Sequence, residues 1–515
     1  MFHRKVILKK SIKIGLLTQI SRFLGLARDL LIARYLGIGT WSDAFITAFK
    51  VPNALRKVFA EGALSATLIP SLVKATKDSQ GVNVSQLMAG AFLFFEGLCF
   101  TFVVVSMYYA HNIVHVIASG FTEVQKQATG QLLFILMPYI LFISISYLFG
   151  GFLQSQGHFL IHAAGPAIGN ILFLLIIALS FYLKLSITTF CMLLVASAFL
   201  LCLINVITYF HSGFSIKMPD KKVLPTLKHI ARQFILCLPS VSFSEINLFI
   251  DTSFASTLET GSISLLYYAN RFMGIPLGVV VGSLTTVLLP QFSHIALTSK
   301  KKLSFYIFES IKLIMWITIP ITLLMILFSY PLFYTLFFSK YFSSDHIKRA
   351  SVILQMFSIG LPALALNRLF LNVLYALDKH TVPAFISIVA VCVNVICNYL
   401  FLETYKTAGL ALATSISAYV QMFLFICILR YYECKVYEKK VAVFLIRYLI
   451  QLTKIGIPII MVYYFILKCM PHNFMSFYSG TWWGFWVLGA PLSLVFCICI
   501  FLSRKHAGFY SFFID

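Results

Sequence analysis

An apolar segment near the N-terminus, about residues 11–36, carries Arg22, Arg28 and Asp29. At 1.5 Å per residue, Arg22 lies roughly 15 Å into this segment, close to the midplane of a bilayer. A charge at that depth costs a few kcal/mol or more unless it faces a partner or a water-filled cavity. The segment therefore predicts a helix with one wet face, and helical spacing puts on that face Ser11, Gly15, Thr18, Arg22, Gly25 and Asp29, with Arg28 beside them.

The composition of the whole chain is that of a polytopic helical membrane protein. Of its 515 residues, 60% are hydrophobic and only 11% are charged, and the mean hydropathy is +0.91. No soluble domain requires such values. The apolar runs predict an all-α protein with about fourteen transmembrane helices, near residues 11–36, 41–72, 84–110, 130–155, 163–183, 187–211, 230–257, 262–292, 304–330, 349–377, 382–402, 407–430, 442–468 and 481–503.

The net charge of +23 is explained by the loops and requires no nucleic acid. If the N-terminus is cytoplasmic, the basic clusters all fall on the cytoplasmic side, as the positive-inside rule demands. An even number of spans then puts the C-terminus on the same side. These clusters are the N-terminal arm and residues 217–232, 300–302, 430–447 and 504–505.

Eleven cysteines predict neither a disulfide framework nor a metal site. Most lie in apolar spans, where cysteine acts as a small hydrophobic residue. We find no Cys/His cluster with metal-ligand spacing and no phosphate-binding loop, so we expect no cofactor.

Two halves of the chain resemble each other at a period of roughly 220 residues. A helix with Pro52 that ends at Pro70 corresponds to a helix with Pro276 that ends at Pro290. Chance alone could produce such matches, but they occur in the same order. We therefore predict two six-helix lobes around a central cavity, residues 1–215 and 216–432, with two further helices in residues 433–515. Repeated bundles place substrate between the halves, near the midplane.

A second charged set follows the first helix. Residues 41–72 contain Asp43, Lys50, Asn53, Arg56, Lys57 and Glu61, and the second half contributes Arg271 next to Asn270. The excess is cationic, and arginine binds phosphate oxygens bidentately at every working pH. A cavity lined in this way favours a pyrophosphate, with carboxylates holding the arginines when it is empty. Lys57 and Glu61 have an alternative, which is to reach the cytoplasmic interface.

The seventh predicted helix has its own polar stripe of Glu245, Asn247 and Asp251. Two interpretations stay open. The stripe is a cation site, or it forms hydrogen bonds between helices.

Residues 21–70 closely resemble the N-terminal signature of the MurJ (MviN) lipid II flippases, in the multidrug/oligosaccharidyl-lipid/polysaccharide exporter superfamily. The elements SR-x-LG-x-x-RD, SDAF, PN-x-x-R and F-AEGA are all present, and the second-half element Tyr-Tyr-Ala-Asp-Arg occurs as Tyr267-Tyr268-Ala269-Asn270-Arg271. The resemblance implies that the cavity is lined by Arg22, Arg28, Asp29, Arg56 and Arg271, and Asp43 and Glu61 also match family positions. We further expect Ser21, Lys50, Asn53 and Asn270 to support this set.

The same resemblance implies a groove for a polyprenyl tail in the last two helices. It also implies a sodium site reported in some members, to which Asp251 corresponds, whereas its partner region near residues 374–379 does not align. Coupling to sodium or to the membrane potential therefore stays open. Asn270 replaces the usual aspartate, which makes the cavity more cationic.

The resemblance thus implies a lipid II flippase of the bacterial inner membrane, a monomer that works by alternating access with membrane lipids and other cell-wall synthesis proteins around it. It is a transporter and not an enzyme. One alternative is an exporter of another lipid-linked oligosaccharide or of a small molecule. The other is a membrane glycosyltransferase acting on the same lipid, which the short external loops oppose.

Overall fold

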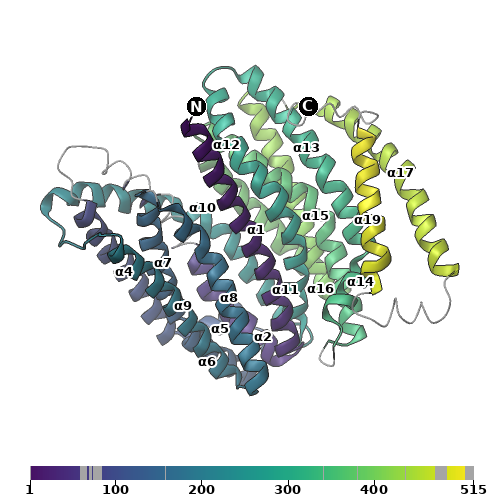
Figure 1. The fold of residues 1–515 in the computed structure, drawn as a ribbon. Helices are drawn as coiled ribbons and strands as arrows, with labels where there is room; N and C mark the ends of the chain where they lie inside the picture. The colour runs from purple at the N-terminus through teal and green to yellow at the C-terminus, as the bar shows by residue number, and fades with distance from the viewer. Residues whose placement is uncertain are drawn as a thin grey trace. The chain divides into compact units, whose positions relative to one another are not determined.

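The computed structural model describes residues 2–57, 59, 67–68, 72, 84–156, 158–339, 342–379, 381–434, 436–469 and 484–504. Within these ranges every regular element is a helix, as predicted (Figure 1). The chain divides into two compact units, residues 1–264 and 265–515, and each is described here by itself.

The first unit contains α1 (Phe2–Leu36), α2 (Thr40–Leu55), α4 (Val84–Tyr108), α5 (Ala110–Ile117), α6 (Glu123–Leu136), α7 (Pro138–Ser155), α8 (Phe159–Leu183), α9 (Ile187–His211), η2 (Lys221–Val223) and α10 (Leu224–Ser256). Its core is aromatic, with Phe95, Phe152, Tyr209 and Phe234 fully buried where α4, α7, α9 and α10 meet. Side-chain caps fix two helix starts, because Thr122 forms a capping box with Gln125 at α6 and Ser186 caps α9.

The second unit contains α12 (Gly282–Ala296), α13 (Lys300–Leu327), α14 (Ser329–Phe337), α15 (Ser344–Ala376), α16 (Thr381–Tyr431), α17 (Glu438–Cys469) and α19 (Gly484–Leu502). It begins within α11 (Ser262–Pro276), which continues as the π-helical η3 (Leu277–Val281). Its core includes Phe370, Phe425 and Tyr448. A Cβ on Gly360 of α15 would lie 2.8 Å from Cα of Ser415 on α16, so the missing side chain lets these helices pack closely.

The helices account for the predicted spans. Among the described residues, eight helical segments are long and apolar enough to cross a membrane, and α19 is a shorter apolar helix. One of the eight, α16, covers two predicted spans and has non-helical dihedral angles at Lys406, where the sequence predicted the break. The predicted spans at 11–36, 230–257 and 262–292 coincide with α1, α10 and the α11–α12 segment. The predicted span at 41–72 begins with α2, and most of it after residue 57, including the predicted end at Pro70, lies outside the described residues. The chain is therefore a polytopic all-α membrane protein.

The predicted lobe boundaries at 215/216 and 432/433 describe the sequence repeat. The compact units divide elsewhere, because α10 packs with α4 in the first unit. The lobe boundaries stay predictions.

Both proline-bearing helices of the predicted repeat change their winding after the proline. Helix α2 passes into a π-helical turn at Arg56 and Lys57, four residues after Pro52. Helix α11 passes into η3 directly after Pro276. Proline removes a backbone donor and clashes with the preceding turn, which disturbs the regular α-helical ladder. The two matched prolines thus have a matched structural consequence.

Candidate functional site

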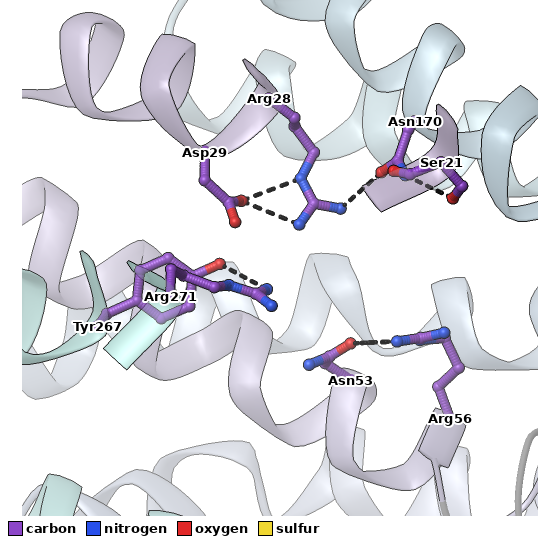
Figure 2. Close-up of polar contacts among 8 residues, drawn as sticks. All are labelled: Ser21, Arg28, Asp29, Asn53, Arg56, Asn170, Tyr267 and Arg271. Carbon is purple, nitrogen blue, oxygen red and sulfur yellow. Dashed lines mark hydrogen bonds and ion pairs between the residues drawn. The ribbon is translucent and has the colours of Figure 1, made fainter. Parts of the chain in front are cut away.

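Arg28 is held by partners on two helices of the first unit (Figure 2). Its Nε and one terminal nitrogen donate to Oδ1 of Asp29 at 3.1 and 2.9 Å, and its other terminal nitrogen donates to Oδ1 of Asn170 at 3.1 Å. The guanidinium carbon also lies 5.0 Å from the centre of the Phe173 ring. The side chain of Arg28 is 17% exposed and that of Asp29 is 5% exposed. A charge within a membrane span is thus neutralised and held in one orientation.

Asn170 of α8 connects this arginine to the polar face of α1. Its amide nitrogen donates to the backbone oxygen of Ser21 at 2.9 Å and to the Ser21 hydroxyl at 3.2 Å. A Cβ on Gly25 would lie 3.6 Å from the Asn170 amide nitrogen, an ordinary van der Waals contact, so α1 and α8 lie close together here without requiring a glycine. Arg22, which was predicted to lie on the polar face of α1 with Gly25 and Asp29, is exposed.

Arg56 is oriented by a residue of its own helix. Its Nε and a terminal nitrogen donate to Oδ1 of Asn53 at 3.2 and 3.1 Å (Figure 2). Both residues are half-buried, and Arg56 lies in the π-helical turn of α2. π-helical turns are rare and occur frequently at functional sites.

Arg271 of the second unit has an aromatic partner. A terminal nitrogen donates to the Tyr267 hydroxyl at 3.0 Å, and the guanidinium carbon lies 5.1 Å from the centre of the same ring (Figure 2). The two residues are one helical turn apart on α11. The side chain of Arg271 is exposed, and Asn270 beside it is half-buried.

Asp43 holds the beginning of α11. Its carboxylate is 2% exposed and accepts from the backbone nitrogens of Gly261 at 2.6 Å and Ser264 at 2.8 Å, and from the Ser264 hydroxyl. A carboxylate at a helix N-terminus satisfies backbone donors that have no partner within the helix. Gly261 has a φ of +95°, and a Cβ there would collide with Ile38. Asp43 therefore stabilises the N-terminus of α11 within the first unit.

Two lysines of α2 contact α10. Lys57 donates to both oxygens of Glu245 at 2.9 and 3.0 Å, and Lys50 donates to the Thr252 hydroxyl at 2.5 Å. These contacts favour the hydrogen-bonding interpretation of the stripe on α10 for Glu245. Glu61, also predicted as a supporting residue, lies outside the described residues.

Asp251, the residue that the family resemblance assigned to a sodium site, is followed in the chain by Thr252, whose hydroxyl accepts from the ammonium of Lys50. Hard cations take oxygen ligands, so an ammonium at the Thr252 oxygen would compete with an ion there. The sodium site stays a prediction.

Several partners were not predicted from the sequence: Asn170, Phe173, Tyr267 and Thr252. Asn170 lies in Gly165–Ile171, a segment that repeats loosely around Asn394, and that repeat was its only signal. Tyr267 stands four residues before Arg271, the spacing of neighbours on one helix face. Nothing in the sequence pairs Lys50 with Thr252, 202 positions apart.

The helices and their buried, partnered charges define the class, which is a polytopic α-helical transporter. A family model described as "Lipid II flippase MurJ" matches residues 32–479. The chain therefore belongs to the MurJ lipid II flippase family, and it is a multi-pass bacterial membrane protein.

Individual relatives agree with this assignment. The chain is 29% identical over 486 residues to a probable lipid II flippase MurJ of Buchnera aphidicola subsp. Schizaphis graminum, covering 92% of this chain and 91% of that protein. It is 27% identical to one of Haemophilus influenzae, covering 95% and 99%.

A solved lipid II flippase MurJ in an inward closed conformation matches with a TM-score of 0.78 at 22% identity, covering 96% of this chain and 99% of that one. An inward-facing multidrug resistance MATE family transporter of the MOP superfamily matches with a TM-score of 0.66 at 15% identity, covering 80% and 94%. At these identities the two structures show the shared fold.

Proposed function

We propose that this protein moves lipid II, the undecaprenyl-pyrophosphate-linked precursor of peptidoglycan, from the cytoplasmic to the periplasmic leaflet for cell-wall synthesis. The observation that carries the proposal is Arg28, a cation inside an apolar helix whose Nε and two terminal nitrogens donate to Asp29 and Asn170. Membership of the lipid II flippase family supports the same substrate. The process is transport by alternating access, with no covalent step and no enzymatic activity.

The arginines bind the pyrophosphate. Guanidinium groups pair with phosphate oxygens through two parallel hydrogen bonds. Arg28 exchanges its Asp29 carboxylate for a phosphate oxygen, so the buried charge keeps an anionic partner in both states. Arg271, exposed and steadied by the Tyr267 ring, supplies a second guanidinium during transport. Substrate that binds the closed state more tightly than the open state drives the closure.

The energy for export comes from the membrane potential and requires no cofactor. Each elementary charge moved through 100 mV changes the free energy by about 2.3 kcal/mol. An anionic pyrophosphate leaving a negative cell interior moves in the favoured direction. The ammonium of Lys50 contacts Thr252, the residue that follows Asp251, and would compete with a cation there, so we expect transport rates to be independent of sodium.

The protein lies in the inner membrane as a monomer, with both termini in the cytoplasm, and the polyprenyl tail rests along α17 and α19. Cysteine labelling tests this orientation. In a cysteine-free background, a cysteine at Ser186 reacts with an impermeant maleimide added to intact cells, and one at Lys301 does not. Labelling at Lys301 in intact cells contradicts the orientation.

Complementation tests the function. We expect the gene to rescue a bacterium depleted of its lipid II flippase, and we expect Arg28→Ala to fail at equal membrane levels. The purified protein should move lipid II across proteoliposome bilayers. Transport of a different lipid-linked oligosaccharide, without transport of lipid II, would favour the alternative exporter. Release of a glycosylated product would favour a glycosyltransferase.

A further inference from the structure

Two histidines and a glutamate gather at the corner between α5 and α6 in the first unit. His111 and His115 are one turn apart on α5, and their Nε2 atoms are 3.2 Å from each other. Oε2 of Glu123, the first residue of α6, lies 3.8 Å from Nε2 of His115. One donor atom from each of the three residues falls within 4.8 Å of the others. The sequence prediction, which found no Cys/His cluster with metal spacing, overlooked this His-x-x-x-His pair.

The separation of the two imidazole nitrogens suits a shared metal ion. Two nitrogens bound to tetrahedral Zn²⁺ at about 2.0–2.1 Å are roughly 3.3 Å apart. Without a metal, two imidazole nitrogens at this distance make only one hydrogen bond. Two histidines and a carboxylate are also a donor set that zinc takes in proteins, with water in the fourth position. The side chains of His115 and Glu123 are 42% and 66% exposed, which leaves room for that water.

Lys126 is the charged neighbour that weakens such a site without blocking it. Its ammonium donates to Oε1 of Glu123 at 3.0 Å, whereas the oxygen that faces His115 is Oε2. One carboxylate oxygen of Glu123 therefore accepts from the lysine, and the other can coordinate a metal ion. The side chain of Lys126 is only 11% exposed, so it is held at this place. Its positive charge repels a divalent ion and lowers the affinity.

The corner is also docked on α10. The backbone nitrogen of Gly120 donates to the Ser256 hydroxyl at 3.0 Å, and the hydroxyls of Ser119 and Ser253 are 3.2 Å apart. A Cβ on Gly120 would lie 2.5 Å from the backbone of Thr257, so the turn sits directly against the end of α10. A link between α5 and α6 at this point stiffens the turn that contacts α10.

We propose that His111, His115 and Glu123 form a binding site for a divalent transition metal ion such as Zn²⁺. The metal joins α5 to the start of α6 and stabilises the corner that rests on α10. In the proposed orientation this corner faces the periplasm, but the binding itself does not depend on the transport function.

Zinc binding to the untagged, full-length protein in detergent tests the proposal. Isothermal titration with ZnCl₂ should give one site per chain. His111→Ala and His115→Ala should each weaken binding at least about tenfold, because each removes one of three ligands. His294→Ala, at an exposed histidine of α12, is the matched control and should bind like the original protein. Absence of a stoichiometric site, or equal affinity in His115→Ala and His294→Ala, overturns the proposal.

Two further variants separate a metal site from a chance group of polar side chains. Glu123→Gln should weaken zinc binding, whereas Lys126→Met should strengthen it severalfold, because methionine keeps the buried volume and removes the competing charge. Bound Co²⁺ should show the visible absorption of a low-coordinate ion in the original protein and lose it in His111→Ala. Unchanged affinity in Lys126→Met together with unchanged affinity in Glu123→Gln contradicts the assignment of Glu123 as a ligand.

Thermal unfolding provides a check on folding. Zinc at 100 times its dissociation constant should stabilise the protein by about 2.7 kcal/mol, and His115→Ala should lose this shift. The metal-free melting temperatures of the two proteins should agree, since His115 is largely exposed. A zinc-induced shift of equal size in His115→Ala contradicts the site.

Discussion

Arg28 and Arg271 both project from membrane helices, but they are held by opposite means. Arg28 is ion-paired with Asp29, bonded to Asn170 and mostly buried. Arg271 contacts the ring and hydroxyl of Tyr267 and is exposed. An aromatic ring orients a guanidinium without cancelling its charge, whereas a carboxylate does both. The first arginine is therefore built into a buried polar network of its unit, and the second is exposed and held against an aromatic ring.

Loss of either Arg28 or Arg271 should reduce lipid II transport to the same extent, and this is the largest effect we expect. Arg28→Ala and Arg271→Ala should each abolish flipping of lipid II in proteoliposomes, because each removes the bidentate phosphate contact that we propose for it. The corresponding lysine variants should recover only part of the rate, since an ammonium is a point charge without the planar fork. Full transport by either alanine variant would show that the arginine in question is not required for flipping.

Arg28→Ala and Arg271→Ala should differ in their effect on the stability of the folded protein. Arg28→Ala leaves the buried Asp29 without its ion pair and should lower the stability of the folded state by about 1–3 kcal/mol. Arg271→Ala removes an exposed side chain and should stay within about 0.5 kcal/mol. Thermal unfolding of the two variants in the same detergent measures the difference. Equal melting temperatures would mean that the Arg28 network contributes no stability.

An aspartate at position 270 would place a carboxylate beside Arg271, as Asp29 lies beside Arg28. Asn270→Asp should keep transport but weaken the binding of lipid II, because the new carboxylate competes with the phosphate for Arg271. One charge at roughly 6 Å is worth on the order of 2–3 kcal/mol at an effective dielectric of 20, and exposure to solvent reduces this to a severalfold change in affinity. Native mass spectrometry of lipid II binding measures it. Tighter binding by the aspartate variant would show that this position does not tune the charge.

The smallest effect should come from the Tyr267 hydroxyl. Tyr267→Phe loses one hydrogen bond to Arg271 but keeps the ring, so lipid II binding should weaken by less than about 1 kcal/mol. Tyr267→Ala also loses the cation–π contact and should weaken binding further. If the two variants behave alike, the ring contributes nothing to the orientation of Arg271.

The sequence predicted the charged helices and part of the arrangement around them. From the cost of a bare charge in a membrane we expected carboxylates to hold the arginines, and in the structure Arg28 forms an ion pair with Asp29, a partner that the sequence did not single out. The matched prolines predicted matched helices, and both show π-helical winding.

What the sequence did not predict is which distant residue completes each contact. Periodicity shows which face of a helix is polar but not what faces it, so Asn170 was missed. Asp43 was predicted as a supporting residue of the cavity. In the structure it binds the backbone nitrogens of Gly261 and Ser264 and the Ser264 hydroxyl, and backbone partners cannot be recognised from residue types in a sequence.

The π-helical turns have a consequence for helix register. A π-helical turn contains one residue more than the α-helical turn it replaces. If such a turn relaxes to α-helix, everything beyond it rotates by about 100° and advances by about 1.5 Å. After α2 the turn begins at Arg56, so relaxation would rotate the residues that follow the turn while Arg56 keeps its bearing relative to Asn53. In the second unit the turn begins after Pro276, downstream of Arg271, so Arg271 would keep its bearing while the following residues rotate. In both proline-bearing helices, relaxation would therefore turn the segment after the π-helical turn relative to an arginine that keeps its bearing.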